Sequence, residues 1–338
     1  MKKVVLILSL FCGFFVFSQE QVAVFKGIQV TGIAVSDKGR IFANFPRWRE
    51  PIPFSLVEVL SDGSYAPYPN AEWNVLKTNQ DKKSNHFVAI QSVLADGQDL
   101  YVLETNNPQF KGVQDCPKLY VFDLNTNLLK QTYNFPEGSF HKNSYINDLR
   151  VDKKRQVVYC TDSGVGGIVV LDLKTGTAKR YLDQHKVTMA ETNQLTCSNG
   201  VWKNTVHSDG IEFDAKNDIL YFHALTAYTL YGIKIDHLLR NDISQIMAIT
   251  TAAPDGLIMD KKGTIYYGDL EHDAIHYLDR KGKIGVLTNN KAKVKWADSF
   301  AIYKDYLYYT NSRINEAIGD IQQLDFTIYK MKLKDSKK

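Results

Sequence analysis

Three aspartates, Asp209, Asp255 and Asp298, occupy equivalent positions in a repeated sequence pattern. In the other three copies of the pattern this position is also polar and holds Thr31, Gln91 and Asn147. Carboxyl groups that are brought together repel each other unless protons, a metal ion or a cationic ligand compensate their charge. The three aspartates are therefore candidates for acid–base chemistry, for metal binding or for binding a cation.

The repeat itself predicts how these residues are positioned. Each copy has alternating apolar residues, a turn rich in Asp, Lys, Gly and Asn, and a second aromatic-rich run, as in 209–225 and 255–270. This pattern is typical of a β-hairpin. Six such hairpins predict an all-β, six-bladed β-propeller with four-stranded antiparallel blades, formed as one domain by residues 19–338. A two-sheet sandwich is the alternative, but it gives no reason for six similar hairpins.

The innermost strands of a propeller line its central channel, so the polar position forms a ring at one mouth of that channel. The next residue along the chain is mostly small, although it is Asp148 in the third copy. The second strand of each hairpin returns to the same face. The polar residues at the ends of these second strands are expected to form a second set around the mouth, made of Glu104, Asp162, His223, Asp269 and Asn311.

Other strand-like segments and large side chains have structural interpretations. The segments 22–27 and 326–333 are expected to pair in one blade and close the propeller. Trp48, Trp73 and Trp296 are expected to pack in the core, and Arg150 is expected to pair with a neighbouring blade.

The N-terminal segment predicts export. Lys2 and Lys3 precede an apolar run over 4–17, and the small residue Ser18 marks the expected cleavage site of a signal peptide over 1–18. The chain is therefore expected to be secreted or periplasmic, with no membrane span in the mature part. The net charge of +4 includes those two lysines, so it does not indicate a nucleic-acid partner.

Export permits disulfides, and three cysteines follow the N-terminal segment. Cys160 lies in a strand-like run and is expected to be a buried apolar residue. Cys116 and Cys197 lie in loop-like sequence and are the candidate disulfide pair.

Several long segments carry a family resemblance, and they are 46–74, 116–127, 146–176, 208–233, 254–275 and 308–313. In this order along the chain they resemble the Yellow / major royal jelly protein family, and most of all its bacterial members related to L-dopachrome tautomerase. The resemblance implies a secreted six-bladed propeller with a ligand at the channel mouth. It also implies dopachrome conversion or amine binding, with Asn311 as a ligand-binding residue. The stretch around Cys197 departs from the family pattern.

Three functions remain open on these residues. The first is a dopachrome-tautomerase-like isomerase, in which Asp209, Asp255, Asp298 and His223 remove and deliver protons. The second is a protein that binds an amine without catalysis. A ligand in either case would contact the polar set made of Gln91, Asn147, Asp148, Asp162, Asp269 and Asn311.

The third function is a calcium-dependent lactonase, similar to the gluconolactonase-type propellers. Asn147, Asp209 and Asp255 would hold Ca²⁺, although Thr31 stands where such a site is expected to have Glu. The sequence favours a small amine- or catechol-derived ligand at the channel mouth over this hydrolase.

Overall fold

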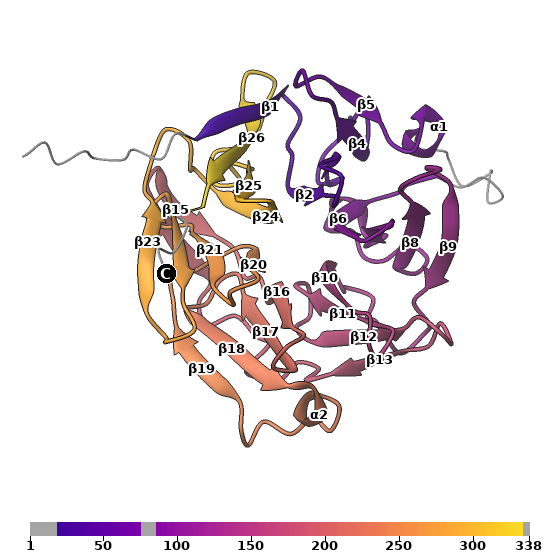
Figure 1. Cartoon of the computed structure of the whole chain (residues 1–338), viewed down its shortest axis with the longest axis vertical. Helices are drawn as coiled ribbons and strands as arrows, with labels where there is room; N and C mark the ends of the chain where they lie inside the picture. Colours follow the sequence, from indigo (N-terminus) through magenta and orange to yellow (C-terminus); the bar gives the residue numbers. More distant parts are fainter. Residues whose placement is uncertain (1–18, 76–85, 334–338) are drawn as a thin grey trace, which may run out of the picture.

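The computed structural model describes residues 19–75 and 86–333, so the predicted signal peptide over 1–18 lies outside the described residues. Six four-stranded antiparallel sheets are arranged as blades around a central axis (Figure 1), which confirms the predicted propeller. The first three blades, from the inner strand outwards, are β2 (Gly32–Val35), β3 (Ile41–Asn44), β4 (Leu56–Val59) and β5 (Tyr65–Pro67); β6 (Ile90–Asp96), β7 (Asp99–Glu104), β8 (Lys118–Asp123) and β9 (Leu129–Asn134); and β10 (Ile146–Asp152), β11 (Val157–Asp162), β12 (Ile168–Asp172) and β13 (Ala178–Tyr181).

The other three blades follow the same order. They are β16 (Ser208–Asp214), β17 (Ile219–Ala224), β18 (Thr229–Lys234) and β19 (Met247–Thr250); β20 (Leu257–Met259), β21 (Ile265–Asp269), β22 (Ala274–Leu278) and β23 (Ile284–Thr288); and β24 (Ala297–Tyr303), β25 (Tyr306–Asn311), β26 (Asp325–Lys332) and β1 (Glu20–Lys26).

The remaining elements lie in the connections between strands. A separate hairpin, β14 (Gln194–Cys197) with β15 (Gly200–Lys203), stands between the third and fourth blades. The described residues also form short helices, which are α1 (Ala71–Asn74), η1 (Pro108–Phe110) and α2 (Ile235–Leu238). Over 19–75 and 86–333, no helix is long and apolar enough to cross a membrane.

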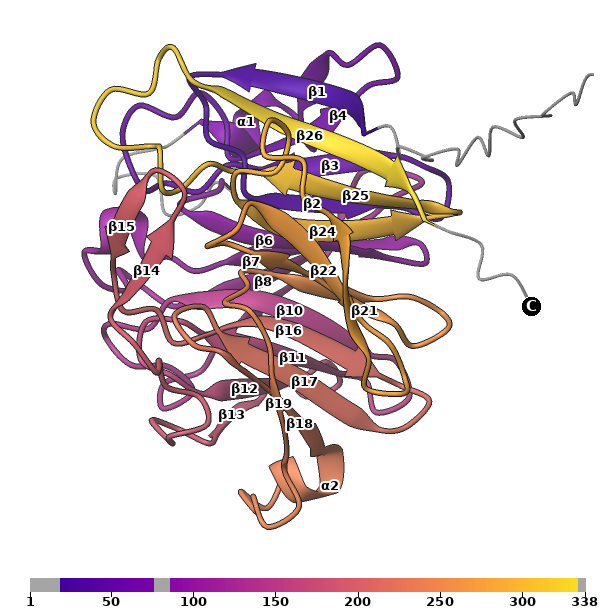
Figure 2. The ribbon, with the colours of Figure 1, turned by 90° about the vertical axis from the view of Figure 1, so that its left-hand side faces the viewer.

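The two ends of the described chain close the ring in one blade, as the sequence predicts. β1 runs antiparallel to β26, with Val24 opposite Thr327 and Phe25 opposite Phe326. Figure 2 shows the two strands side by side at the edge of the molecule. The Phe25 ring is fully buried and meets Phe45 of the first blade at 4.9 Å between ring centroids. The strand β1 therefore completes the last blade by hydrogen bonds to β26 and connects that blade to the first one by packing.

Apolar side chains between facing sheets form the core in wedges. Trp73 packs against Phe87 and Phe122 with ring centroids 5.0 and 5.1 Å apart, so its expected core position is confirmed. Buried aromatic rings at such distances add specific edge-to-face contacts to the apolar burial. Arg150 lies 3.3 Å from Glu212 of the neighbouring blade, as expected.

Candidate functional site at the channel mouth

β-Bulges turn the ring residues into the channel. The pairing of β6 with β7 slips at Gln91, and that of β10 with β11 slips between Ile146 and Leu149. The same slip occurs around Asp209 in β16 and around Asp298 in β24. A bulge leaves extra residues unpaired and bends the strand, so it redirects a side chain. In these four blades the repeated polar position therefore faces the channel because the inner strand begins with an irregular step, whereas Thr31 and Asp255 stand just before the regularly paired strands β2 and β20.

Small residues beside the ring let neighbouring inner strands approach closely. A Cβ atom on Gly210 would lie 2.4 Å from the Asp255 carbonyl oxygen, and one on Gly256 would lie 2.5 Å from that of Asp298. The Gly256 N–H instead donates to the Asp298 carbonyl across 2.7 Å. The small residues predicted from the sequence are thus required by backbone contacts between blades.

A cavity of about 380 Å³ opens at this mouth. Its floor is polar and consists of Gln91, Asn147, Asp209, Asp255 and Asp298. Its wall includes five aromatic side chains, which are Trp48, Phe110, Tyr145, Trp202 and Trp296. The β14–β15 hairpin contributes Trp202, whose ring packs on Trp296 at 5.0 Å between centroids. Thr31, the sixth ring position, is buried and does not line this cavity.

One hydrogen-bond chain connects wall and floor. Trp48 Nε1 donates to the Tyr145 hydroxyl (2.6 Å), and that hydroxyl donates to Gln91 Oε1 (2.7 Å). The chain then runs from Gln91 Nε2 to Asn147 Oδ1 (2.9 Å) and from Asn147 Nδ2 to Asp209 Oδ2 (2.7 Å). Because an indole N–H only donates, it fixes the direction of every later bond. The Asn147 amide nitrogen therefore faces Asp209.

The three floor carboxyl groups hold their protons more tightly than ordinary aspartates. Burial raises the pKa of Asp255 to about 7, although the hydrogen bond from Trp296 Nε1 (2.6 Å) opposes this shift. Burial, followed by the charge of Asp255, raises the pKa of Asp209 and of Asp298 well above the usual range. Asp209 also shares a side-chain hydrogen bond with Asp255. The floor can consequently store and release protons near neutral pH.

Asp148 lies deeper in the channel than the cavity floor. Its Oδ1 accepts a hydrogen bond from Ser92 Oγ (2.8 Å), and its Oδ2 lies 3.2 Å from Arg150 Nη1. The side chain lines a narrow space below the ring together with Asp209 and Asp298. The half-buried Arg150 thus compensates the charge of Asp148, and Asp148 does not line the upper cavity.

The expected second polar set is not gathered at the mouth. His223 is buried with Nδ1 at the Ala224 carbonyl oxygen and Nε2 at 3.0 Å from Thr251 Oγ1, so its ring faces the outer strands of its blade. Burial lowers its pKa to about 4. Asp269 lies 2.9 Å from His272 Nδ1 and 3.4 Å from His276 Nε2, outside the cavity. Neither residue lines the cavity.

Asp162 and Asn311 accept hydrogen bonds from backbone N–H groups and do not face the cavity. Asp162 Oδ1 accepts from the Tyr145 N–H (2.9 Å), and its Oδ2 pairs with Arg180 (2.8 Å). Asn311 Oδ1 accepts from the N–H groups of Lys295 (2.7 Å) and Trp296 (3.3 Å). Both side chains therefore position wall residues of the cavity, and neither lines it.

Two of the aromatic wall residues could have been found from their spacing to the ring positions in the sequence. Tyr145 stands two residues before Asn147, and Trp296 stands two residues before Asp298. Alternation along the strand places both on the channel side, one step above the ring. Trp296 is fully buried as expected, but it also donates a hydrogen bond to the floor. The expected core position of Trp48 is wrong, because its side chain is half-buried and lines the cavity. Phe110 and Trp202 come from connections with no repeat pattern.

Residues 95–338, well over half of the chain, match the sequence profile of the major royal jelly protein. The chain belongs to this family. The region that matches the curated relatives is shorter. "Protein yellow" of Drosophila pseudoobscura pseudoobscura is 30% identical over 122 residues, which are 33% of this chain and 21% of the fly protein. The Drosophila guanche protein of the same name is 29% identical over the same shares. The match thus spans about a fifth of these relatives.

Solved structures share the fold of this royal jelly family member at low identity. A luciferin-regenerating enzyme is 11% identical with a TM-score of 0.60, covering 94% of this chain and 95% of that one. Regucalcin from Agrobacterium tumefaciens, described as a calcium-binding protein, is 14% identical with a TM-score of 0.58, covering 94% and 96%. Virginiamycin B lyase from Staphylococcus aureus is 12% identical with a TM-score of 0.56, covering 94% and 100%. These similarities show the propeller fold alone.

The candidate calcium ligands are arranged for hydrogen bonding. Asn147 turns its amide nitrogen, a donor, towards Asp209, while its carbonyl oxygen is taken by Gln91. Ca²⁺ requires six to eight oxygen ligands. In 19–75 and 86–333 no three His, Cys, Asp or Glu side chains form a metal-binding group. Asn147, Asp209 and Asp255 therefore do not fit Ca²⁺ as they stand.

The predicted disulfide is corrected by the structure. Cys116, Cys160 and Cys197 are all free thiols. Cys116 lies in the connection from β7 to β8 of the second blade, near Asp115 and Lys118. Cys197 ends β14 and packs in the cluster of Leu195 and Trp296, where burial raises the pKa of its thiol to about 11. The two cysteines belong to separate packing environments and do not pair.

Proposed function

We propose that this royal jelly family protein binds a small aromatic amine- or catechol-derived molecule in the cavity at the channel mouth. The observation that carries the proposal is the three-carboxyl floor beneath five aromatic side chains. Aromatic faces attract both a flat ring and an organic cation. Buried acids that lose a proton when a cation arrives gain a compensating charge. We also propose, from the segment 1–18, that the chain is exported.

A proton-transfer reaction on the bound molecule is the catalytic form of this proposal. Tautomerisation needs one group to remove a proton and another to deliver it, and a pKa near the working pH suits both roles. Asp209 and Asp255 share a hydrogen bond, and the pKa of Asp255 lies at about 7. In this scheme Asp255 takes a proton from the substrate while protonated Asp209 or Asp298 delivers one.

Calorimetry tests the binding proposal. We expect dopamine, serotonin or tryptamine to bind, and Asp298→Asn or Asp209→Asn to weaken that binding about tenfold, the size of one charge-assisted hydrogen bond. Asp37→Asn is the matched control, because Asp37 lies in an exposed turn between β2 and β3. Binding should also release protons to the buffer. Absence of binding by every amine at millimolar concentration contradicts the proposal.

The catalytic form has its own measurement. Purified protein is incubated with dopachrome, and its decay is compared with that in heat-treated protein and in Asp255→Asn. Acceleration by the wild type and its loss in Asp255→Asn are expected. Amine binding without acceleration would leave a binding protein and exclude this isomerase activity.

A further inference from the structure

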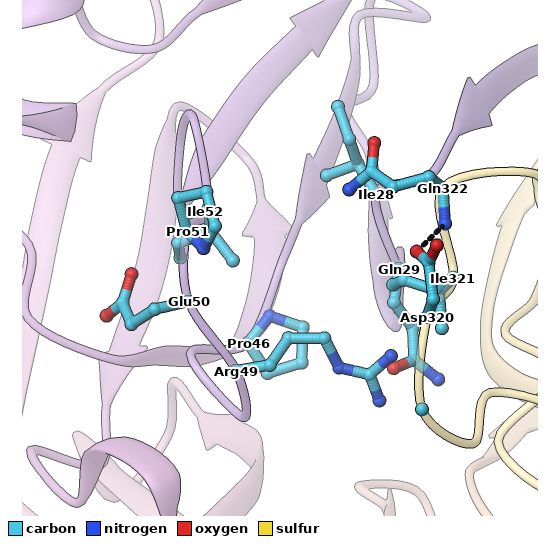
Figure 3. Close-up of a pocket in the computed structure, with 12 residues that line it drawn as sticks. Ile28, Gln29, Pro46, Arg49, Glu50, Pro51, Ile52, Asp320, Ile321 and Gln322 are labelled. Carbon is cyan, nitrogen blue, oxygen red and sulfur yellow. Dashed lines mark hydrogen bonds between the residues drawn. The ribbon is translucent and has the colours of Figure 1, made fainter.

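A second cavity of about 230 Å³ lies beside the channel mouth. The loop over 46–52 and the loop over 319–322 form its two sides (Figure 3). Gln29 and Arg49 line both this side cavity and the central one. These two side chains therefore stand at the junction, within reach of a ligand in either space.

The Arg49 guanidinium has unused donors. Its Nη2 donates to the Ala317 carbonyl (3.1 Å), whereas its Nη1 is buried without a hydrogen-bond partner. The neighbouring acid Glu50 pairs with Arg47 instead, at 2.7 Å. Burial lowers the pKa of Arg49, and within 19–75 and 86–333 no acid offsets that shift. A half-buried guanidinium without a counter-charge is costly, and a bound carboxylate would compensate it.

Gln29 offers an acceptor at the same junction. It is 7% exposed, its Nε2 donates to the Ser312 carbonyl (2.9 Å), and its Oε1 is buried without a partner. Figure 3 shows the Arg49 side chain extending from its loop in the direction of Gln29. A ligand that satisfies both atoms must present a carboxylate to Arg49 and an N–H donor to Gln29. An amino acid head group has this combination.

Other charged groups near the two cavities are already satisfied. Asp320 is exposed, and its Oδ1 accepts from the Gln322 N–H at 2.9 Å (Figure 3). In a separate depression on the last blade, Lys295 lies 3.4 Å from Asp273 and Arg313 lies 2.5 Å from Glu316. Those cations have acidic partners within the chain. Arg49 differs from them because the part of the chain that the structure describes gives it no acidic partner, so a ligand can take that place.

We propose that Arg49 and Gln29 form a subsite that binds the carboxylate of the ligand. The ligand is then an aromatic amino acid, or a derivative that keeps both the carboxylate and the basic nitrogen. The aromatic ring lies among the wall side chains, the carboxylate binds Arg49 Nη1, and the nitrogen donates to Gln29 Oε1 and faces the acidic floor. This inference rests on the proposed function, since it names the class of molecule that the central cavity takes.

Matched ligand pairs test the subsite by calorimetry. L-DOPA is compared with dopamine and L-tryptophan with tryptamine, because each pair differs only by the carboxylate. We expect the wild type to bind each amino acid at least about tenfold more tightly than its amine, the range of a charge-assisted hydrogen bond. Arg49→Gln should remove this preference while changing amine affinity less than about twofold, and Arg49→Lys should keep part of it. Arg240→Gln is the control, because Arg240 is exposed beyond α2.

The outcomes separate this inference from the proposed function. Equal binding of amine and amino acid by the wild type, or an equal loss of both in Arg49→Gln, overturns the subsite while amine binding stands. Binding of indole-3-propionate alone, lost in Arg49→Gln, supports the carboxylate subsite and overturns the amine proposal. Failure of every ligand overturns both. A thermal unfolding curve of Arg49→Gln like that of the wild type shows that the effect is local.

Discussion

Trp296 donates its indole N–H to Asp255 Oδ2 across 2.6 Å, so a wall residue of the cavity is bonded directly to its floor. The indole ring is fully buried, and the acid that it contacts has a pKa of about 7. The same aromatic group thus shapes the space for a ligand and lowers the pKa of the acid that faces it. A substitution of Trp296 therefore changes both the shape of the cavity wall and the pKa of Asp255.

Trp296→Phe should separate these two effects. The substitution keeps an aromatic ring but leaves Asp255 without its donor, so the pKa of Asp255 should rise further above 7. The free energy of unfolding should fall by about 1–3 kcal/mol, because a buried acceptor is left unpaired and the ring is smaller. Urea unfolding measures the stability, and the pH midpoint of amine binding measures the pKa.

Trp73→Phe is the control for that substitution. Trp73 packs in a core cluster with Phe87 and Tyr120 and lies outside the cavity. Its replacement should lower stability without moving the pH midpoint of binding. Equal midpoints in wild type and Trp296→Phe would contradict the predicted role of the indole N–H.

Asp255 should make the protein less stable as the pH rises. Its pKa is about 7 in the folded chain against 3.8 for an ordinary aspartate, so between these values the folded state keeps a proton that the unfolded state has released. Stability then falls with pH, by up to about 1.4 kcal/mol per pH unit for one proton. His223 acts in the opposite sense below its ordinary pKa of 6.5, because burial keeps its ring neutral when folded.

The comparison of wild type with Asp255→Asn isolates the aspartate from the histidine. Urea unfolding at pH 5, 6, 7 and 8 should show that the variant gains stability relative to wild type as the pH rises towards 7. Asp37→Asn, in an exposed turn, should follow the wild type at every pH. A pH-independent difference between wild type and Asp255→Asn would exclude the raised pKa.

Phe25 should be a main contributor to ring closure. Its ring is fully buried between Phe45 and Tyr65, at 4.9 Å from each centroid, although it belongs to the strand that completes the last blade. Phe25→Ala should cost about 3–5 kcal/mol in the free energy of unfolding. Leu128→Ala is the surface control, since Leu128 is 67% exposed, and should change stability by less than about 0.5 kcal/mol. A small loss in Phe25→Ala would mean that the closure does not depend on this contact.

The fold and the floor were predictable because their signals are local. Each hairpin carries its own alternation and turn, and the ring position repeats with it, so Asp209, Asp255 and Asp298 are found from the sequence. The second polar set was misplaced for a physical reason. Asp162 and Asn311 end strands at the correct face, but they accept backbone N–H groups that would otherwise be unpaired. Sequence alone does not show which acceptor a polar side chain takes.

Calcium should leave the wild-type protein unchanged. Trp48 directs the hydrogen-bond chain through Tyr145 and Gln91, so the Asn147 amide presents nitrogen to Asp209. A cation would have to break this chain before it found a carbonyl oxygen there. With a dissociation constant above about 10 mM, 1 mM Ca²⁺ stabilises the folded state by less than about 0.1 kcal/mol. Thermal unfolding with 1 mM Ca²⁺ and with chelator should therefore coincide.

Asn147→Asp gives that measurement a positive control. The substitution replaces the donor with a carboxylate beside Asp209 and Asp255, which repels them and supplies the oxygen ligands that Ca²⁺ prefers. The variant should be less stable than wild type in chelator and should recover stability with added Ca²⁺. A calcium-dependent rise of several degrees in the wild-type Tm would instead mean that the Asn147 amide flips and presents its oxygen towards Asp209. The lactonase-type metal site would then fit the floor.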